Sequence, residues 1–176
     1  ISHPTPYIYM VVTCGDDIGK THVILQKQLA LNSLKLSAGF SLIMPDSYIG
    51  LPGFDVNSGE IERHKIQESL KLIPQIAEDI VARKHVFRVK PGPFPWLKSF
   101  VLRPLFYRFF TGPRLFRSND ACIHCGKCAK ICPTANITME QGRPQWHDNC
   151  TNCLACYHIC PKHSIVFGKY SKNKGQ

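Results

Sequence analysis

The feature that most constrains this chain is a pair of cysteine runs in its last third. Residues 122–133 read CIHCGKCAKICP and residues 150–161 read CTNCLACYHICP, so each run has the spacing C-x-x-C-x-x-C-x-x-x-C-P. Eight of the nine cysteines lie in these two runs. The runs align at an offset of 28 residues, at which Ile131 and Ile137 recur as Ile159 and Ile165. This repetition predicts a pseudo-twofold arrangement of two similar halves.

Such a spacing is typical of iron–sulfur binding. Three thiolates at two-residue intervals can hold one side of a [4Fe–4S] cube, and the proline after the fourth cysteine turns the chain away because it fixes φ. Zinc is the alternative, since it also accepts four thiolates with C-x-x-C spacing. Zinc sites usually combine two such pairs, without a third cysteine two residues on. We therefore predict two [4Fe–4S] clusters.

Composition limits the compartment and the partners. The sequence contains no secretory signal and no apolar run long enough to span a bilayer, so clustered cysteines indicate metal binding in a reducing, cytoplasmic and anaerobic setting. The net charge is +10, and residues 91–117 carry five basic residues and no acidic one. This charge can steer an acidic redox partner protein. No recognition motif accompanies it, so we expect no nucleic acid, and Pro104 favours packing over membrane docking for the aromatic residues around it.

The first half predicts an α/β fold. Residues 7–14 and 38–44 are apolar runs typical of buried strands, and residues 20–35 and 60–84 have helical periodicity. This strand–helix–strand–helix order favours a parallel sheet. Two strands do not make a stable sheet alone, so we expect another chain segment or subunit to pair with the strand at 7–14.

The helices of this half have definite apolar patterns. The first helix is expected to be covered on more than one side, with an arc of Val23, Ile24, Ala30, Leu31 and Leu34, and with Leu25 and Leu29 off that arc. The second helix carries a stripe of Ile61, Ile66, Leu70, Ile73, Ala77, Ile80 and Val81. Asn57 and Glu60 resemble a capping box at its start, and Pro74 is expected to kink it.

The second half divides into three segments. Residues 91–117 form an aromatic, basic connector in which 98–110 can be helical, with Pro104 as an interruption. Residues 118–168 form the cysteine-rich domain, a small α+β unit in which 137–146 is a hairpin that turns at Gly142. Residues 169–176 are a polar tail.

Taken together, the TCG at 13–15, the SAGFSLIMPDSYI at 37–49 and the paired cysteine runs resemble a family of flavodoxin-like/ferredoxin fusion proteins. The resemblance implies that residues 1–90 are the C-terminal half of a flavodoxin-like domain and that a bacterial-type two-[4Fe–4S] ferredoxin domain follows. The strands at 7–14 and 38–44 correspond to the last two of five flavodoxin-like strands. The earlier strands and the phosphate-binding loop have no counterpart in this sequence.

The resemblance also implies site residues. In two-cluster ferredoxins the fourth cysteine of each run binds the other cluster. The implied ligand sets are Cys122, Cys125, Cys128 and Cys160 for one cluster, and Cys150, Cys153, Cys156 and Cys132 for the other. FMN in the complete protein would contact the loop Thr13, Cys14, Gly15 and Asp16, together with Tyr48.

The expected function is electron transfer through two low-potential clusters, between a ferredoxin-type donor and a flavin or partner oxidoreductase. The alternative is that this chain is the C-terminal part of an FMN-dependent reductase. No pair of general acid and base residues and no activated nucleophile is evident, so we expect no catalytic residues in the chain itself.

Overall fold

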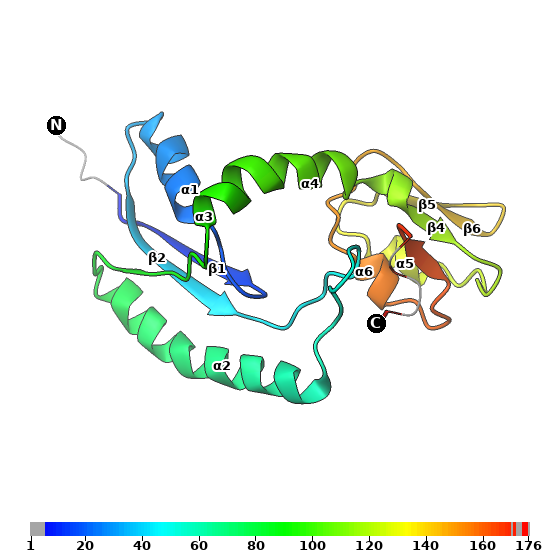
Figure 1. Cartoon of the computed structure of the whole chain (residues 1–176), viewed down its shortest axis with the longest axis horizontal. Coiled ribbons are helices and arrows are strands. Elements are labelled where there is room, and N and C mark those ends of the chain that lie inside the picture. The colour runs from blue at the N-terminus through cyan, green and yellow to red at the C-terminus, as the bar shows by residue number, and fades with distance from the viewer. Residues whose placement is uncertain (1–5, 170, 172–173, 176) are drawn as a thin grey trace. The chain divides into compact units, whose positions relative to one another are not determined.

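The structure, a computed structural model, describes residues 6–169, 171, 174 and 175. The remaining residues of the predicted polar tail, and residues 1–5, lie outside the described part. The chain forms two compact units (Figure 1). Unit 1 combines the residues up to Asp46 with Asn57–Arg103, and unit 2 combines Ser47–Val56 with the residues from Pro104 on.

Unit 1 contains a parallel three-stranded sheet between two helices. The strands are β1 (Ile8–Cys14), β2 (Leu36–Ile43) and β3 (Phe87–Arg88), in the order β1-β2-β3. The helices α1 (Thr21–Ala30) and α2 (Gly59–Val81) lie on opposite faces of this sheet (Figure 1). The mixed α/β class and the parallel pairing are therefore confirmed.

The third strand was not expected from the sequence. It is only two residues long, and it lies beside β2 on the side away from β1. A side chain at Gly39 of β2 would come within 2.9 Å of the Phe87 ring, so glycine allows this close approach. Within the part of the chain that the structure describes, β1 pairs only with β2 and remains an edge strand.

Each face of the sheet has its own small core. The face toward α2 buries Ala38, Phe40, Leu42 and Ile76. The face toward α1 buries Met10, Ile18 and Leu36, with Leu25 and Leu29 packed against them. A register shift between Ile8 and Tyr9 of β1 accompanies the change of face between Leu36 and Ala38.

The prediction for the first helix was wrong in two respects. The helix ends at Ala30, because Ser33 takes a left-handed conformation with φ of 56° and turns the chain. It is also not covered on several sides, since none of its residues is fully buried. Leu25 and Leu29, which lie off the predicted arc, face the core, whereas Leu31 is 78% exposed.

The second helix forms near the predicted bounds and continues through Pro74, but only part of its predicted apolar stripe, including Ile80, packs against the core. Its buried residues are Ser69, Ile76 and Asp79, whereas Leu70 and Val81 are exposed. Ser69 and Asp79 tolerate burial because Ser69 Oγ donates to the Ile43 carbonyl at 2.7 Å and Asp79 pairs with Lys84 and Arg88.

The predicted capping box at the start of this helix was wrong as well. The N-cap residue is Ser58, which makes no side-chain capping bond. Asn57 uses its Oδ1 to accept a hydrogen bond of 2.9 Å from the backbone N–H of Asp46 instead.

The connector is more helical than expected. Helix α3 (Pro95–Leu97), the π-helical turn η1 (Lys98–Leu102) and helix α4 (Arg103–Phe109) follow one another without a break. Pro104 therefore does not interrupt the helix. The wider π turn lies where a regular helix would bring a carbonyl against the proline ring, and it accommodates the missing N–H.

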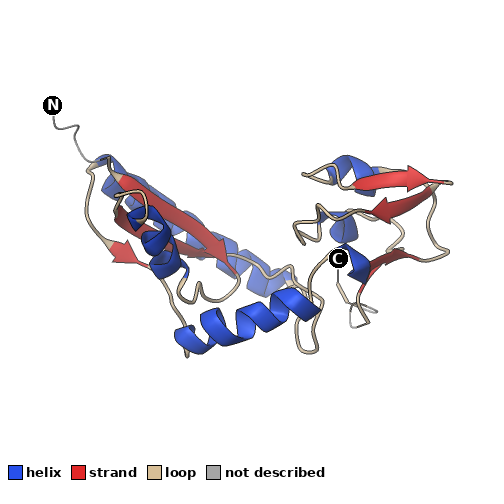
Figure 2. Ribbon diagram, turned by 90° about the horizontal axis from the view of Figure 1, so that it is seen from above, coloured by secondary structure: helices blue, strands red, loops and turns tan. Residues whose placement is uncertain are grey.

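Besides most of α4, the described residues of unit 2 form two short antiparallel ladders and two further short helices. Strand β5 (Ile137–Glu140) pairs with β6 (Arg143–Trp146), which confirms the predicted hairpin. Strand β4 (Phe116–Ser118) pairs with β7 (Ile165–Phe167), an unpredicted ladder. Both ladders are drawn in red in Figure 2. The remaining elements are the 3-10 turn η2 (Pro113–Leu115), α5 (Lys127–Ile131) and α6 (Ala155–His158).

No helix among residues 6–169 is long and apolar enough to cross a membrane.

Candidate metal centre

The two cysteine runs have left-handed residues at matching positions. His124 and Gly126 in the first run have φ of 57° and 69°, and Asn152 and Leu154 in the second have φ of 58° and 60°. These positions differ by 28 residues, the offset of the sequence repeat. Left-handed residues at these intervals curl each loop around its thiols. Gly126 adopts this conformation without strain because it has no Cβ. Leu154 adopts it with a side chain, and that side chain is buried.

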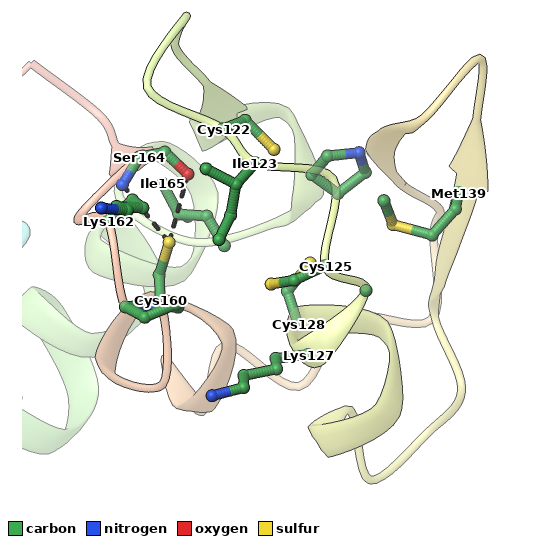
Figure 3. Close-up of a pocket in the computed structure, with 13 residues that line it drawn as sticks. Cys122, Ile123, Cys125, Lys127, Cys128, Met139, Cys160, Lys162, Ser164 and Ile165 are labelled. Atoms are coloured by element: carbon green, nitrogen blue, oxygen red, sulfur yellow. Dashed lines mark hydrogen bonds between the residues drawn. The ribbon is translucent and has the colours of Figure 1, made fainter.

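The loops form two pockets. The first pocket has about 340 Å³ of space, open solvent included. Three of its thiols come from the first run and one from the second, namely Cys122, Cys125, Cys128 and Cys160. Figure 3 shows these four side chains around the pocket, with Ser164 beside Cys160.

The second pocket has about 290 Å³ of space by the same measure. Its thiols follow the reciprocal pattern and are Cys150, Cys153, Cys156 and Cys132. The structure thus groups the eight cysteines in the two sets that the sequence resemblance implies. Their role as metal ligands stays a prediction.

Backbone N–H groups point at several of these sulfurs. The Asn136 N–H lies 3.3 Å from Cys132 Sγ, and the Ser164 N–H lies 3.3 Å from Cys160 Sγ. The two contacts are again related by the repeat. Amides directed at sulfur stabilise a thiolate and, equally, a negatively charged cluster bound to it.

These contacts divide the thiols into two classes. Burial acts to raise the pKa of Cys132 and of Cys160, but hydrogen bonds from Thr134 and Asn136 to the former, and from Ser164 to the latter, lower both pKa values overall. Burial raises the pKa of Cys128, and it raises the pKa of Cys156 to about 11. Hydrogen bonds thus favour the thiolate at the fourth cysteine of each run, whereas burial disfavours it at Cys128 and Cys156.

Buried polar atoms without partners gather at the second pocket. Asn136 Nδ2 and Trp146 Nε1 are buried and have no hydrogen-bond partner among the described residues, and both residues line this pocket. An unpaired buried donor costs about 1–3 kcal/mol. A sulfur-rich group held by four thiolates would supply acceptors, so the residues present fit an iron–sulfur cluster.

The thiols do not converge as they would on a single ion. No three His, Cys, Asp or Glu side chains within the described ranges are placed to hold one metal ion.

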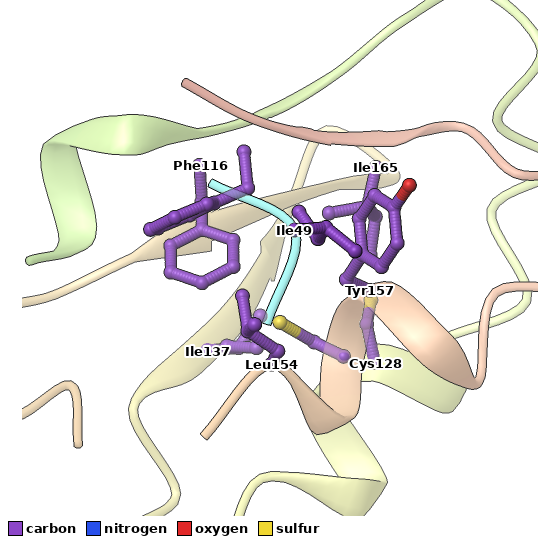
Figure 4. Close-up of a cluster of buried hydrophobic side chains, with 9 residues drawn as sticks. Ile49, Phe116, Cys128, Ile137, Leu154, Tyr157 and Ile165 are labelled. Atoms are coloured by element: carbon purple, nitrogen blue, oxygen red, sulfur yellow. The ribbon is translucent and has the colours of Figure 1, made fainter. Parts of the chain in front are cut away.

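A segment from the first half of the chain completes the core of unit 2. Ile49, which follows β2 in sequence, is fully buried among Phe116, Leu154 and Tyr157 (Figure 4). The Ser47 carbonyl lies 2.9 Å from His158 Nε2. Sequence reasoning missed this role, although the apolar Ile49 within a loop rich in Pro and Gly was a usable signal.

The residues considered for flavin binding fall into both units. Thr13 and Cys14 end β1, and Gly15 and Asp16 follow it in unit 1. Tyr48 belongs to unit 2, where the rings of Phe54, Phe106 and Phe167 surround it at centroid distances of 5.9, 5.4 and 6.2 Å. Flavin contact at these positions stays a prediction.

One polar group near this loop was missed by sequence reasoning. Lys65 reaches from α2 to the carboxyl ends of the strands, where its Nζ lies 2.7 Å from Asp46 Oδ2 and donates to the Gly15 carbonyl at 3.0 Å. Its position in the exposed half of the helical pattern gave no signal of this.

Comparison with known proteins identifies only the cysteine-rich part. Searches of curated proteins and of solved structures found no match. The family model of a 4Fe-4S dicluster domain matches residues 114–161. This range contains all eight cysteines of the two pockets, strand β4 and the β5–β6 hairpin, whereas β7 lies beyond it. Residues 114–161 are therefore a ferredoxin-type iron–sulfur domain.

Proposed function

We propose that this domain carries two [4Fe–4S] clusters, one in each pocket, and that each cluster is held by three cysteines of one run and the fourth of the other. The observation that carries the proposal is the partition of the eight thiols into two sets of four. When bound, each cluster supplies reversible one-electron chemistry at low potential.

The chain's own residues hold and tune that chemistry. The thiolates anchor the clusters, and backbone N–H groups such as those of Asn136 and Ser164 offset negative charge on the sulfurs. The buried side chains of Leu154, Ile137 and Ile165 keep water from the inner side of each site. Cys125 and Cys153 are exposed, so each pocket has one thiol near the surface, where electrons can enter or leave.

The proposed role is electron transfer between a ferredoxin-type donor and a flavin or partner oxidoreductase. The supporting observation is charge: the helical connector and the iron–sulfur domain are basic, which suits an acidic redox protein. We further propose that the edge of β1 pairs with a β-strand of such a partner or of an upstream flavodoxin-like half.

A second candidate is the C-terminal part of an FMN-dependent reductase. The observation that favours it is the parallel sheet, in which Thr13–Asp16 lie at the carboxyl end of β1, where doubly wound α/β folds bind ligands. Flavin would then accept or deliver the electrons that pass through the clusters.

Anaerobic purification with iron, sulfide, zinc and flavin quantified tests both candidates. Two clusters predict about eight iron and about eight sulfide per chain. Two zinc ions without iron would contradict the electron-transfer proposal. Stoichiometric FMN would favour the reductase, and its absence would count against it.

A further inference from the structure

The two pockets differ in the side chains that face the bound group. In the second pocket, Trp146 and Asn136 each present a buried N–H donor that has no partner among the described residues. The residues at the corresponding positions of the repeat are Ser118 and Ser164. Ser118 does not line the first pocket, and Ser164 Oγ already pairs with Cys160 Sγ at 3.1 Å.

Both donors are held rigidly. The Trp146 ring stacks on Phe116 with a centroid distance of 5.6 Å and an interplanar angle of 14°, and its residue pairs with Ile137 across the β5–β6 ladder. The Asn136 side chain is oriented by its Oδ1, which accepts a hydrogen bond of 2.7 Å from the Asn149 N–H. Because Oδ1 faces the Asn149 donor, the group of Asn136 that lacks a hydrogen-bond partner among the described residues is its NH₂ group.

From this asymmetry we propose that Trp146 and Asn136 are positioning residues that donate hydrogen bonds to the sulfurs of the group bound in the second pocket, and that they raise its reduction potential relative to the first. The inference rests on the proposed function, since it requires a cluster in that pocket.

The direction follows from charge. A reduced cluster is more negative by one electron, so buried N–H donors stabilise the reduced form more than the oxidised form. The first pocket has Lys127 and Lys162 nearby instead, but both side chains are exposed and water screens them. Each pocket also has one hydroxyl beside its crossing cysteine, Ser164 at Cys160 and Thr134 at Cys132, so the two unpaired N–H donors make the difference.

Trp146→Phe tests the proposal because phenylalanine retains an aromatic ring against Phe116 and removes the donor. In the holoprotein, redox titration followed by electron paramagnetic resonance should show one midpoint potential shifted to lower values, by about 59 mV if the oxidised-to-reduced ratio changes tenfold. The matched control is Trp96→Phe, at the chain's other tryptophan, which should leave both potentials unchanged. Unchanged potentials in Trp146→Phe, or an equal shift of both, would overturn the inference.

A second measurement decides the matter if Trp146→Phe does not assemble its clusters. In Trp96→Phe protein labelled with ¹⁵N-indole tryptophan, Trp146 is the only tryptophan, and the reduced cluster should show electron–nuclear coupling to its nitrogen. Absence of this coupling in iron-loaded protein would overturn the inference but leave the proposed function intact. Protein without iron would instead contradict the proposed function and the inference with it.

Discussion

At the scale of single residues, the residue type that fits at some positions is determined by one neighbouring side chain. Gly15 is the clearest example, because a Cβ there would lie 1.8 Å from Asp46 Oδ1. The glycine leaves room for the carboxylate that pairs with Lys65 at the carboxyl ends of the strands. Neither the sequence pattern nor the resemblance distinguishes this packing role from a ligand-binding role.

Gly15→Ala should therefore destabilise unit 1. The methyl group displaces Asp46 and leaves Lys65, whose side chain is 15% exposed, without its nearest carboxylate, which should cost about 1–3 kcal/mol of unfolding free energy. The measurement is the thermal unfolding midpoint. The control Gly59→Ala adds a methyl group that meets only the Arg63 side chain, at 3.5 Å, and an equal effect of both substitutions would contradict this account.

The burial of Tyr48 predicts that the stability of the fold falls with rising pH in the alkaline range. Burial raises its pKa to about 12, above the value of about 10 for an unfolded tyrosine. The folded state thus favours the protonated phenol, and this stabilisation is complete below pH about 10 and is lost as the pH rises toward about 12.

Tyr48→Phe should lose less stability than the wild type between pH about 10 and about 12. Thermal unfolding of both proteins across this range measures the difference. Tyr9→Phe, at a tyrosine that is 49% exposed, is the control. Parallel pH profiles for wild type and Tyr48→Phe would contradict burial of this phenol.

At the scale of secondary-structure elements, the strongest sequence patterns were sufficient to predict an element, and the weaker ones were not. The apolar runs that became β1 and β2, and the hairpin with Gln141 and Gly142 at positive φ, were predictable from local sequence. The rotation of α2 was not, because Ser69 and Asp79 are buried through partners that only the folded chain brings to them. Strand β3 and the two strands of the β4–β7 ladder are too short to leave a periodic signal in the sequence.

The edge position of β1 predicts unequal amide exchange within the sheet. Strand β2 has partners on both sides, whereas β1 pairs only with β2 in the described part of the chain. Hydrogen–deuterium exchange of the isolated 176-residue chain should be faster for the outward-facing amides of β1 than for those of β2. Full protection of β1 would show that another segment covers this edge.

Ile49, in the segment Ser47–Val56 between β2 and α2, is expected to stabilise the cysteine-rich unit. Ile49 has no exposed surface and packs in the core that also contains Cys128 and Cys156. Ile49→Ala should lower the stability of unit 2 by about 2–5 kcal/mol and make its clusters easier to lose. Release of iron during heating measures this effect. Ile61→Ala, at a residue that is 50% exposed, is the control, and equal iron release from both variants would contradict the packing.

At the scale of the whole molecule, the cysteine spacing predicted more than any other feature. It indicated the iron–sulfur domain and the repeat, because ligand spacing is a local property of the sequence, whereas the crossed grouping of the thiols came from the family resemblance. The asymmetry between the pockets was not predictable, since Trp146 reaches the second pocket only through the pairing of β5 with β6. The flavodoxin-like relation of unit 1 stays a prediction that rests on resemblance.

The central claim is that each pocket binds one cluster through ligands that cross between the runs. A variant in which Cys122, Cys125 and Cys128 are all replaced by serine should retain the cluster of the second pocket, with about four iron per chain. The mirror variant, with Cys150, Cys153 and Cys156 replaced, provides the reciprocal case if the first does not fold.

Iron and sulfide content after one more substitution in that background tests the claim most directly. Adding Cys132→Ser should remove or destabilise the remaining cluster, because Cys132 lines the second pocket, whereas adding Cys160→Ser should leave about four iron in place. The opposite result, iron lost with Cys160→Ser and retained with Cys132→Ser, would contradict the crossed arrangement.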